Sequence, residues 1–283
     1  MVGKKRKPSL EIVYYLVLLL IVCFVLLPIV FTIANALRYE DAEIFTYTQK
    51  LSVYTFIPNS FSLRHFVRLF TENQFYKPIL NSFFVAVVTV VCGFLINGLA
   101  GYTFAKFRFR GRNLLFFIFL FSFMIPFEVI AIPLYKTSDT LGILNTRLAL
   151  ILPMIGNGMI VFLYRQFFQD IPDSIIESAV IDGAGTLHTF FRLIVPLSKP
   201  IIISASLMTF IQQWDSFMWP LVAASTKNLK VVQVAIAEFT GENFIDWTLI
   251  YAATTLAILI PALLLLPLQK YYIQGIAGTG LKE

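Results

Sequence analysis

Apolar residues along this chain form six long runs that are separated by polar segments. The runs cover residues 12–36, 79–104, 114–135, 148–168, 201–224 and 249–268. About 20 consecutive apolar residues are enough for a helix to cross the roughly 30 Å hydrocarbon core of a bilayer. The pattern therefore predicts an all-α polytopic membrane protein with six transmembrane helices and with both termini on the same side of the membrane.

Composition supports lipid as the solvent of these runs. Hydrophobic residues make up 58% of the 283 residues, charged residues 13%, and the mean hydropathy is +0.79. A soluble core cannot hide that much apolar surface, so lipid must cover the remainder. The first run is too long for the core of a signal peptide and no small-x-small cleavage site follows it, so we expect it to remain as a span. Cys23 and Cys92 lie inside apolar runs, which argues against a disulfide framework.

Lysine and arginine set the predicted orientation, because loops rich in them stay on the cytoplasmic side. A cytoplasmic N-terminus places more of them inside, namely Lys4, Lys5, Arg6, Lys7, Lys106, Arg108, Arg110, Arg112, Arg165, Arg192, Lys199, Lys270 and Lys282. We therefore expect a cytoplasmic N-terminal segment (1–11), a six-span domain (12–268) with a cytoplasmic loop at 169–200, and a cytoplasmic tail (269–283). The first external loop, of about 40 residues, is expected to form a small cap or a docking surface. The net charge of +6 belongs to the loops, and no nucleic-acid partner is expected.

The predicted cytoplasmic loop is unusually long and polar, with the sequence ESAVIDGAGTLHTFFRLIVPLSKP over residues 177–200. Upstream of it, Asp170 is an N-cap candidate for a short helix, with a proline in the first turn. Gly183 and Gly185 can take the positive φ that ends this helix, and Thr186 can cap a second helix.

The second short helix has an apolar face at helical spacing. Leu187, Phe190, Phe191 and Ile194 fall at i, i+3, i+4 and i+7, and the helix is expected to end at Pro196 and Pro200. Two short helices at an angle predict a protruding elbow, anchored by the phenylalanines, with carboxylates on its exposed part.

The loop also carries a recognisable set of residues at fixed spacing. Glu177-Ser178-Ala179, Asp182-Gly183-Ala184, Phe190, Pro196-Leu197 and Pro200 resemble the "EAA" loop in the membrane subunits of ATP-binding-cassette importers, in the form found in carbohydrate permeases. Further similarities lie at Asn81-Ser82, Gly101-Tyr102, Phe104-Ala105, Phe109-Arg110-Gly111-Arg112, Ile125-Pro126, Pro133-Leu134-Tyr135, Trp214, Phe217 and Trp219-Pro220-Leu221. Together they resemble the smaller, six-span partner of a maltose-type permease. Four positions depart from the pattern: Ser178, Leu193, Val195 and Asp215.

The resemblance implies a coupling helix that sits in a cleft of an ATPase subunit. The residues implied in this contact are Glu177, Ser178, Ala179, Asp182, Gly183, Ala184, Phe190 and Pro196. It also implies a second homologous permease subunit, two ATPase subunits that bind ATP and Mg, an extracytoplasmic sugar-binding protein and a bacterial or archaeal plasma membrane. No cofactor or metal is expected in this chain itself. Local chemistry alone leaves the alternative of a solvated acidic loop that touches nothing.

Polar residues on the fifth run are the candidates for a substrate pathway, since polar groups inside a membrane are costly. They are Gln212, Gln213, Trp214, Asp215 and Trp219, whose indoles can stack on sugar faces and whose amides and carboxylate can bond hydroxyls. The alternative is that Trp219 marks the interfacial belt and that Asp215 snorkels or bonds a neighbouring helix.

Other polar and small residues inside the runs favour structural roles. Asn97, Asn157 and Gln166 are expected to form interhelical hydrogen bonds, and Gly98 and Gly101 to permit close helix contact. Glu128, between Pro126 and Pro133, is expected to hold a broken helix open, to line a cavity, or to lie near the outer surface. His65 and His188 lack metal-ligand spacing and are expected to be structural or solvated.

Enzymatic and self-sufficient transport functions are less well supported. The sequence has no Gly-x-x-x-x-Gly-Lys-Ser/Thr loop, no His-Glu-x-x-His and no Gly-x-Ser-x-Gly motif, so we expect another chain to hydrolyse ATP. A secondary carrier or channel for a small polar solute is the alternative. Such carriers are often built from two similar halves, and no internal repeat is visible.

Overall fold

The computed structural model describes residues 8–49, 52–241 and 245–280, and these are almost entirely helical. The helices are α1 (Pro8–Ala36), α2 (Asp41–Gln49), α3 (Arg64–Thr71), α4 (Tyr76–Lys106), α5 (Arg112–Met124), α6 (Phe127–Thr140), α7 (Arg147–Ile155), α8 (Gly158–Gln169), α9 (Asp173–Ile181), α10 (Thr186–Thr189), α11 (Val195–Leu197), α12 (Lys199–Trp214), α13 (Met218–Ala223), α14 (Val232–Ala237) and α15 (Trp247–Gly280). Over the described ranges, β pairing is limited to one bridge between Thr240 and Ile245. The prediction of an all-α protein is confirmed.

The helices long and apolar enough to cross a membrane only partly follow the six predicted runs. Residues 11–36, 76–106 and 247–270 each form one such helix. Three further candidates are bent pairs: α5 with α6 at 99°, α7 with α8 at 43°, and the 186–197 segment with α12 at 88°. By length and composition, the described residues supply three spans, or up to six if each bent pair is one span.

Three predicted runs were wrongly taken as continuous helices. The third run breaks at Ile125 and Pro126, because Pro126 has no N–H to continue the helix and restricts the backbone of the residue before it. The fourth breaks at Gly156, whose extended backbone ends α7. The fifth ends at Trp214 and resumes at Met218, so it is also two helices.

Two compact units divide the chain, and residues 1–75 with 236–259 form the first. α1 has none of its apolar window buried within the chain, which suits a helix covered by lipid or by another subunit. The segment after α1 is organised by Arg38, whose guanidinium is fully buried. It donates to the Asn35 side chain at 2.9 Å and to the backbone oxygens of Tyr54 and Thr55. At the start of α15, Asp246 pairs with Arg68 at 2.9 Å and accepts from the backbone amide of Leu249.

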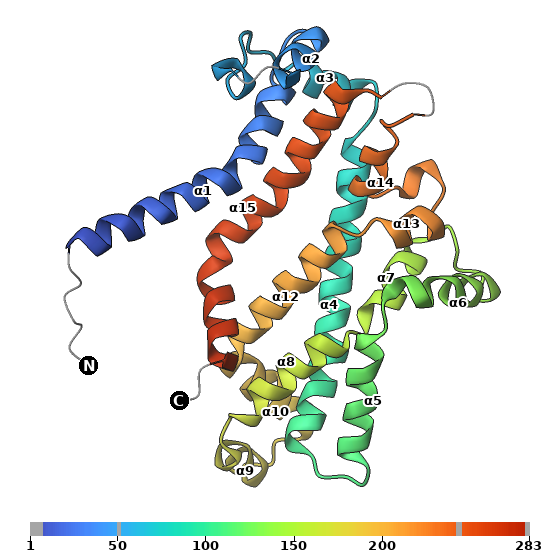
Figure 1. Ribbon diagram of the computed structural model, residues 1–283. Coiled ribbons are helices and arrows are strands. Elements are labelled where there is room, and N and C mark those ends of the chain that lie inside the picture. The colour runs from blue at the N-terminus through green and yellow to red at the C-terminus, as the bar shows by residue number, and fades with distance from the viewer. Residues whose placement is uncertain (1–7, 50–51, 242–244, 281–283) are drawn as a thin grey trace. The chain divides into compact units, whose positions relative to one another are not determined.

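Residues 76–235 with 260–283 form the second unit, in which α7, α8 and α12 pack against α4 (Figure 1). Gly101 permits the close approach of α8: a Cβ placed on it would lie 2.6 Å from the Cβ of Tyr164. A Cβ on Gly98 would lie 3.3 Å from the ring of Phe190. The prediction that Gly98 and Gly101 permit close helix contact is confirmed.

Side chains from neighbouring helices satisfy backbone groups that the breaks leave open. At the α7–α8 break, Asn97 of α4 donates to the Ile155 carbonyl at 2.8 Å and accepts from the Asn157 amide at 3.0 Å. Inside α7, Pro153 cannot donate to the carbonyl of Ala149, and Trp219 Nε1 donates to that oxygen at 2.8 Å instead. Such replacement partners are what a broken helix needs where water is scarce. The predicted interhelical roles of Asn97 and Asn157 are confirmed.

The predicted cytoplasmic tail begins inside the last helix. α15 continues as helix through Gly280, and residues 281–283 lie outside the described part of the chain.

Candidate functional site

The loop between α8 and α12 forms the predicted elbow, but it starts later than the sequence suggested. Asp170 caps the C-terminal end of α8, and α9 begins at Asp173 after Pro172. The expected N-cap at Asp170 is therefore wrong, because its own amide still donates to carbonyls at the end of α8. Ile171, which is buried, fixes the chain between the two helices.

A lysine from α4 fastens the start of α9. Lys106 Nζ lies 2.6 Å from Asp173 Oδ1 and also donates to the carbonyl of Ile171. The hydrogen bond and the charge of Lys106 lower the pKa of the Asp173 carboxyl. The first turn of the elbow is thus tied to the end of a long helix.

Gly183 ends α9 in a Schellman motif. Its φ is +80°, a conformation that glycine adopts without steric cost, as predicted. The Ala184 amide donates to the carbonyl of Ala179 at 2.9 Å, and the Gly183 amide donates to that of Val180 at 3.0 Å. This pattern makes a sharp, well-defined turn with its backbone exposed.

The second arm of the elbow begins at Thr186, with Gly185 as its N-cap, so the expected cap at Thr186 is wrong. After α10 the chain widens into a π-helical turn, Phe190–Ile194. Phe190 and Ile194 are fully buried, whereas Leu187 and Phe191 are exposed. Only half of the predicted apolar face is therefore buried among the described residues, and the anchoring of the elbow in the membrane interface by Phe191 stays a prediction. The arm ends at Leu197, next to the predicted Pro196 and Pro200, and α12 leaves at 88°.

Phe190 anchors the elbow in an aromatic cluster of the second unit. Its ring centroid lies 5.4 Å from that of Tyr102 and 6.3 Å from that of Phe168. Tyr164 stacks on Phe168 at 5.6 Å with nearly parallel rings. Aromatic pairs at these distances add to the energy of burial, so the second arm is rigidly attached to α4 and α8.

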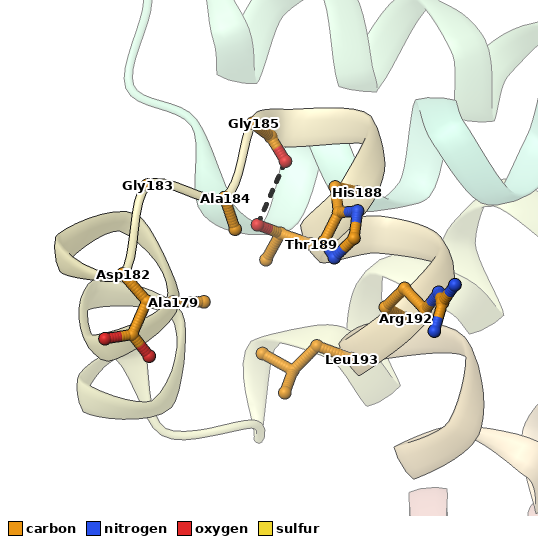
Figure 2. A pocket seen from close by; sticks show the side chains of 9 residues that line it. All are labelled: Ala179, Asp182, Gly183, Ala184, Gly185, His188, Thr189, Arg192 and Leu193. Atoms are coloured by element: carbon orange, nitrogen blue, oxygen red, sulfur yellow. Dashed lines mark hydrogen bonds between the residues drawn. The ribbon is translucent and has the colours of Figure 1, made fainter.

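The other residues of the predicted coupling set lie on the surface. Glu177, Ser178, Asp182, Gly183 and Pro196 are exposed, and Ala179 and Ala184 are partly exposed. The elbow encloses a hollow of about 500 Å³, with Asp182 on the α9 side and His188 and Arg192 on the other (Figure 2). The sequence reasoning missed Val180 and Ile181, which are apolar and strongly exposed beside these carboxylates. Two adjacent aliphatic residues in a polar loop were the available signal.

The second predicted group, at the end of α12, is divided between buried and exposed side chains. Trp214 and Trp219 are 1% and 2% exposed, and Gln213 is also buried. Trp214 stacks on Phe210 with ring centroids 5.9 Å apart. Gln212 and Asp215 are exposed, so an amide and a carboxylate, rather than the indoles, present polar atoms at this point of the chain.

Each exposed group at the end of α12 has one amide partner from another element. Asn157 Nδ2 donates to Gln212 Oε1 at 3.2 Å, and Gln233 Nε2 donates to Asp215 Oδ1 at 3.4 Å. Gln233 was missed, although it is the single polar residue in the run Val231 to Ala237. Amides and a carboxylate can together donate to and accept from hydroxyl groups. Among the described residues, no group of three or more His, Cys, Asp or Glu side chains is arranged to hold a metal ion.

Comparison with known families agrees with the loop motif. Residues 97–278 match the family described as "binding-protein-dependent transport system inner membrane component". The chain belongs to this family. The resemblance to membrane subunits of ABC importers is thereby confirmed.

Several curated inner membrane components are similar over most of their length. The arabinooligosaccharides transport system permease protein AraQ of Halalkalibacterium halodurans is 30% identical over 80% of this chain and 82% of that protein. The sn-glycerol-3-phosphate transport system permease protein UgpE of Pectobacterium atrosepticum is 32% identical over 71% of this chain and 72% of its own length. The corresponding UgpE of Yersinia pestis is 27% identical over 97% of this chain and 99% of that protein.

A solved structure shares the fold of this inner membrane component. A chain of a bacterial ABC transporter involved in the import of the acidic polysaccharide alginate superposes with a TM-score of 0.82. The match covers 96% of this chain and 99% of that chain, at 21% sequence identity. At this identity the similarity establishes the fold alone.

Proposed function

We propose that this chain is one of two membrane-spanning subunits of an ATP-driven importer that receives a carbohydrate from a separate binding protein. In this proposal it crosses a bacterial or archaeal plasma membrane six times with both termini in the cytoplasm, and it contributes half of the translocation pathway. A second homologous permease completes the pathway, and two ATPase subunits bind ATP and Mg. The names of the relatives, which transport arabinooligosaccharides or sn-glycerol 3-phosphate, support a polyhydroxylated substrate.

The elbow 169–200 is the observation that carries the proposal. One arm is fixed by Phe190 in the aromatic cluster, while the other arm exposes Glu177, Asp182 and the aliphatic side chains of Val180 and Ile181. Exposed apolar residues next to carboxylates suit a docked protein better than water. An ATPase subunit that moved α9 would also move α4 and α8 through Phe190 and Lys106, which is how closure of the ATPase would change the access of the pathway.

Substitution of Gly183 tests this coupling role. Gly183→Val should abolish substrate-stimulated ATP hydrolysis in the reconstituted complex, because a side chain would project from the turn that docks on the ATPase. A Cβ at Gly183 would meet no atom within 4 Å inside the chain, so only the backbone strain of roughly 1–2 kcal/mol opposes folding. Gly142→Val is a matched control, since Gly142 also has a positive φ, +66°, and open surroundings.

The expected controls separate coupling from assembly. Both variants should insert and pull down the second permease, and Gly142→Val should keep full stimulation. Glu177→Ala should weaken stimulation, whereas Ser178→Ala should be silent because its hydroxyl only donates to the Ser174 carbonyl of its own helix. Full stimulation in Gly183→Val would remove the main support for the proposal. Uptake that needs no ATPase at all would favour the secondary carrier instead.

The role of the α12 end in the pathway is tested separately. Asp215→Ala and Gln212→Ala should each reduce uptake while leaving basal ATPase activity and assembly unchanged, because both side chains are exposed and contribute little to packing. Gln213→Ala, at the buried neighbouring position, is expected to reduce stability instead. Normal uptake by the Gln212→Ala, Asp215→Ala double variant would refute a pathway at this point.

A further inference from the structure

A second hollow, unrelated to the elbow, lies along the first turns of α4. It has a volume of about 460 Å³ and is lined by Leu80, Phe83, Phe84, Val87, Val88 and Arg147. Leu80, Phe83, Phe84 and Val87 follow each other at i, i+3, i+4 and i+7, so they form one apolar face of the helix, and all four are exposed. Five of the six lining side chains therefore have no group that can bond a sugar hydroxyl or a peptide.

The sixth lining residue is a cation with only neutral partners. The Arg147 guanidinium lies 4.6 Å from the centre of the Phe84 ring, and Nη2 lies 3.4 Å from Asn81 Oδ1. Within the described ranges, Arg147 makes no salt bridge to a carboxylate, and its side chain is exposed. An arginine beside an apolar surface is best matched by an amphipathic anion. The negative group of such a ligand pairs with the guanidinium, and its apolar part covers the surface.

The position of Arg147 in its helix adds to the positive potential. Arg147 is the first residue of α7, directly after the N-cap Thr146, whose hydroxyl accepts from the Ala149 amide. A helix N-terminus carries a partial positive charge, so a basic residue there is normally unfavourable. The guanidinium of Arg147 and the N-terminus of α7 therefore attract a negative group to the same place. No residue in the described ranges provides a negative charge there.

The sequence places this cation at the level of the lipid headgroups. Arg147 immediately precedes the apolar run 148–168, and Leu80 lies near the start of the run 79–104. A residue at the end of an apolar run lies at the boundary between hydrocarbon and water, where phospholipid phosphates are found. The hollow extends from that boundary along the exposed α4 face formed by Leu80, Phe83, Phe84 and Val87.

We propose that this hollow binds one anionic phospholipid, with an acyl chain along Leu80, Phe83, Phe84 and Val87 and the phosphate at Arg147. The apolar lining fits the chain, and the single unpaired cation fits the headgroup. A second permease subunit docked on the same face would need to place a carboxylate at the membrane boundary to pair with Arg147. An anionic lipid already carries its negative charge at that depth. The inference concerns the membrane-embedded chain and holds whether or not the proposed transport function is correct.

Native mass spectrometry of the complex purified in a neutral detergent tests the proposal. The delipidated complex is titrated with an equimolar mixture of phosphatidylglycerol and phosphatidylcholine of identical acyl chains. Wild type should retain one phosphatidylglycerol about five- to tenfold more strongly, the effect expected of roughly 1 kcal/mol or slightly more from one interfacial cation. Free sn-glycerol 3-phosphate should not displace this lipid, because it lacks the acyl chains.

Three variants separate the contributions of charge and shape. Arg147→Gln should abolish the preference for phosphatidylglycerol, and Arg147→Lys should retain it. Val87→Trp should reduce retention of both lipids by filling the hollow. Arg64→Gln is the matched control, since Arg64 is also an exposed arginine near an aromatic ring, Tyr39, and should bind lipid like wild type.

The following results would overturn the proposal. Equal retention of the two lipids by wild type would show that the headgroup charge is not recognised, and displacement by free glycerol 3-phosphate would show a site for a small anion. An unchanged preference in Arg147→Gln would show that this arginine is not the headgroup partner. Loss of the second permease from the Val87→Trp complex, with lipid retention unchanged, would show that the hollow is a subunit interface.

Discussion

A single methyl group added at Gly101 should force α4 and α8 apart. A Cβ at this position would lie 2.6 Å from Tyr164 Cβ, 3.1 Å from the Arg165 amide nitrogen and 3.3 Å from the Val161 carbonyl. Carbon atoms pack favourably at about 3.5–4.0 Å, so the new methyl is roughly 1 Å too close to Tyr164. None of these three atoms can rotate away, because two are backbone atoms and the third is attached directly to the backbone. The helices themselves must therefore separate.

The expected cost follows from overpacking in a close-packed interior. Inserting a methyl group without room typically costs about 1–3 kcal/mol, which lowers the melting temperature of a protein of this size by roughly 2–5 °C. Gly101→Ala should show this shift when the solubilised protein is heated and the remaining monodisperse fraction is measured by size-exclusion chromatography with fluorescence detection. Gly156→Ala is the control, because its added Cβ meets no atom within 4 Å and its φ is −81°.

The melting temperatures of the two alanine variants show whether the contact at Gly101 is as close as described. Gly101→Ala should melt well below wild type, and Gly156→Ala should melt close to it. If Gly101→Ala melted at the wild-type temperature, α4 and α8 would be farther apart at Gly101 than the 2.6 Å distance to Tyr164 Cβ indicates. An equal loss in both variants would refute the contact at Tyr164 as the cause, because helix propensity and chain entropy both favour alanine over glycine and cannot produce a loss.

Three further predictions concern polar contacts that join different segments of the chain. Trp219→Phe should lower the melting temperature, because it leaves the Ala149 carbonyl without its donor at a cost of about 1–3 kcal/mol; an unchanged melting temperature would contradict this. Arg38→Lys should speed proteolysis of the segment 37–75, because an ammonium group cannot reach the separate carbonyls that the guanidinium binds, and wild-type digestion would refute it. Lys106→Met should remove an acid-sensitive contribution to stability. Because Lys106 lowers the pKa of Asp173, the contribution is complete above the unfolded aspartate value of about 3.9 and is lost as the pH falls through the lower folded pKa. Melting curves from pH 7 downwards should show this loss in wild type and not in the variant.

The helical class and the main glycine contacts could be predicted from the sequence because they depend on local pattern. Run length predicts helices that suit a membrane, and small residues such as Gly98 and Gly101 inside a run indicate a close neighbour. The breaks were harder to predict, since Pro126 ends a helix whereas Pro28 and Pro153 lie inside one. In the helix of Pro153 another element, Trp219, supplies the donor that the proline lacks, and no local pattern contains that information.

The residues of the two candidate sites could be selected from the sequence, but which of their side chains are buried and which are exposed could not. Gly183 adopts the positive φ that its position in the loop suggested, because that requirement is local. The π-helical turn at Phe190 was not predictable from spacing, and neither was the division of the apolar face into buried Phe190 and exposed Phe191. The burial of Trp214 likewise depends on Phe210 and on the packing of α12, which composition does not show. The functional roles of both groups of residues stay predictions.

The bond from Trp219 to Ala149 also sets an order of events during synthesis of the chain. Donor and acceptor are 70 residues apart, so at roughly 5–20 residues per second the indole emerges about 4–14 s after the carbonyl that it serves. Throughout that interval, α7 has a backbone oxygen that Pro153 cannot satisfy, at a place where the lipid offers no donor. Early insertion of α7 would therefore be unfavourable until α13 arrives. A nascent chain halted before Trp219 should remain at the insertion machinery or be degraded. Its fourth apolar run contains the Ala149 carbonyl, and the donor for that carbonyl has not yet been translated.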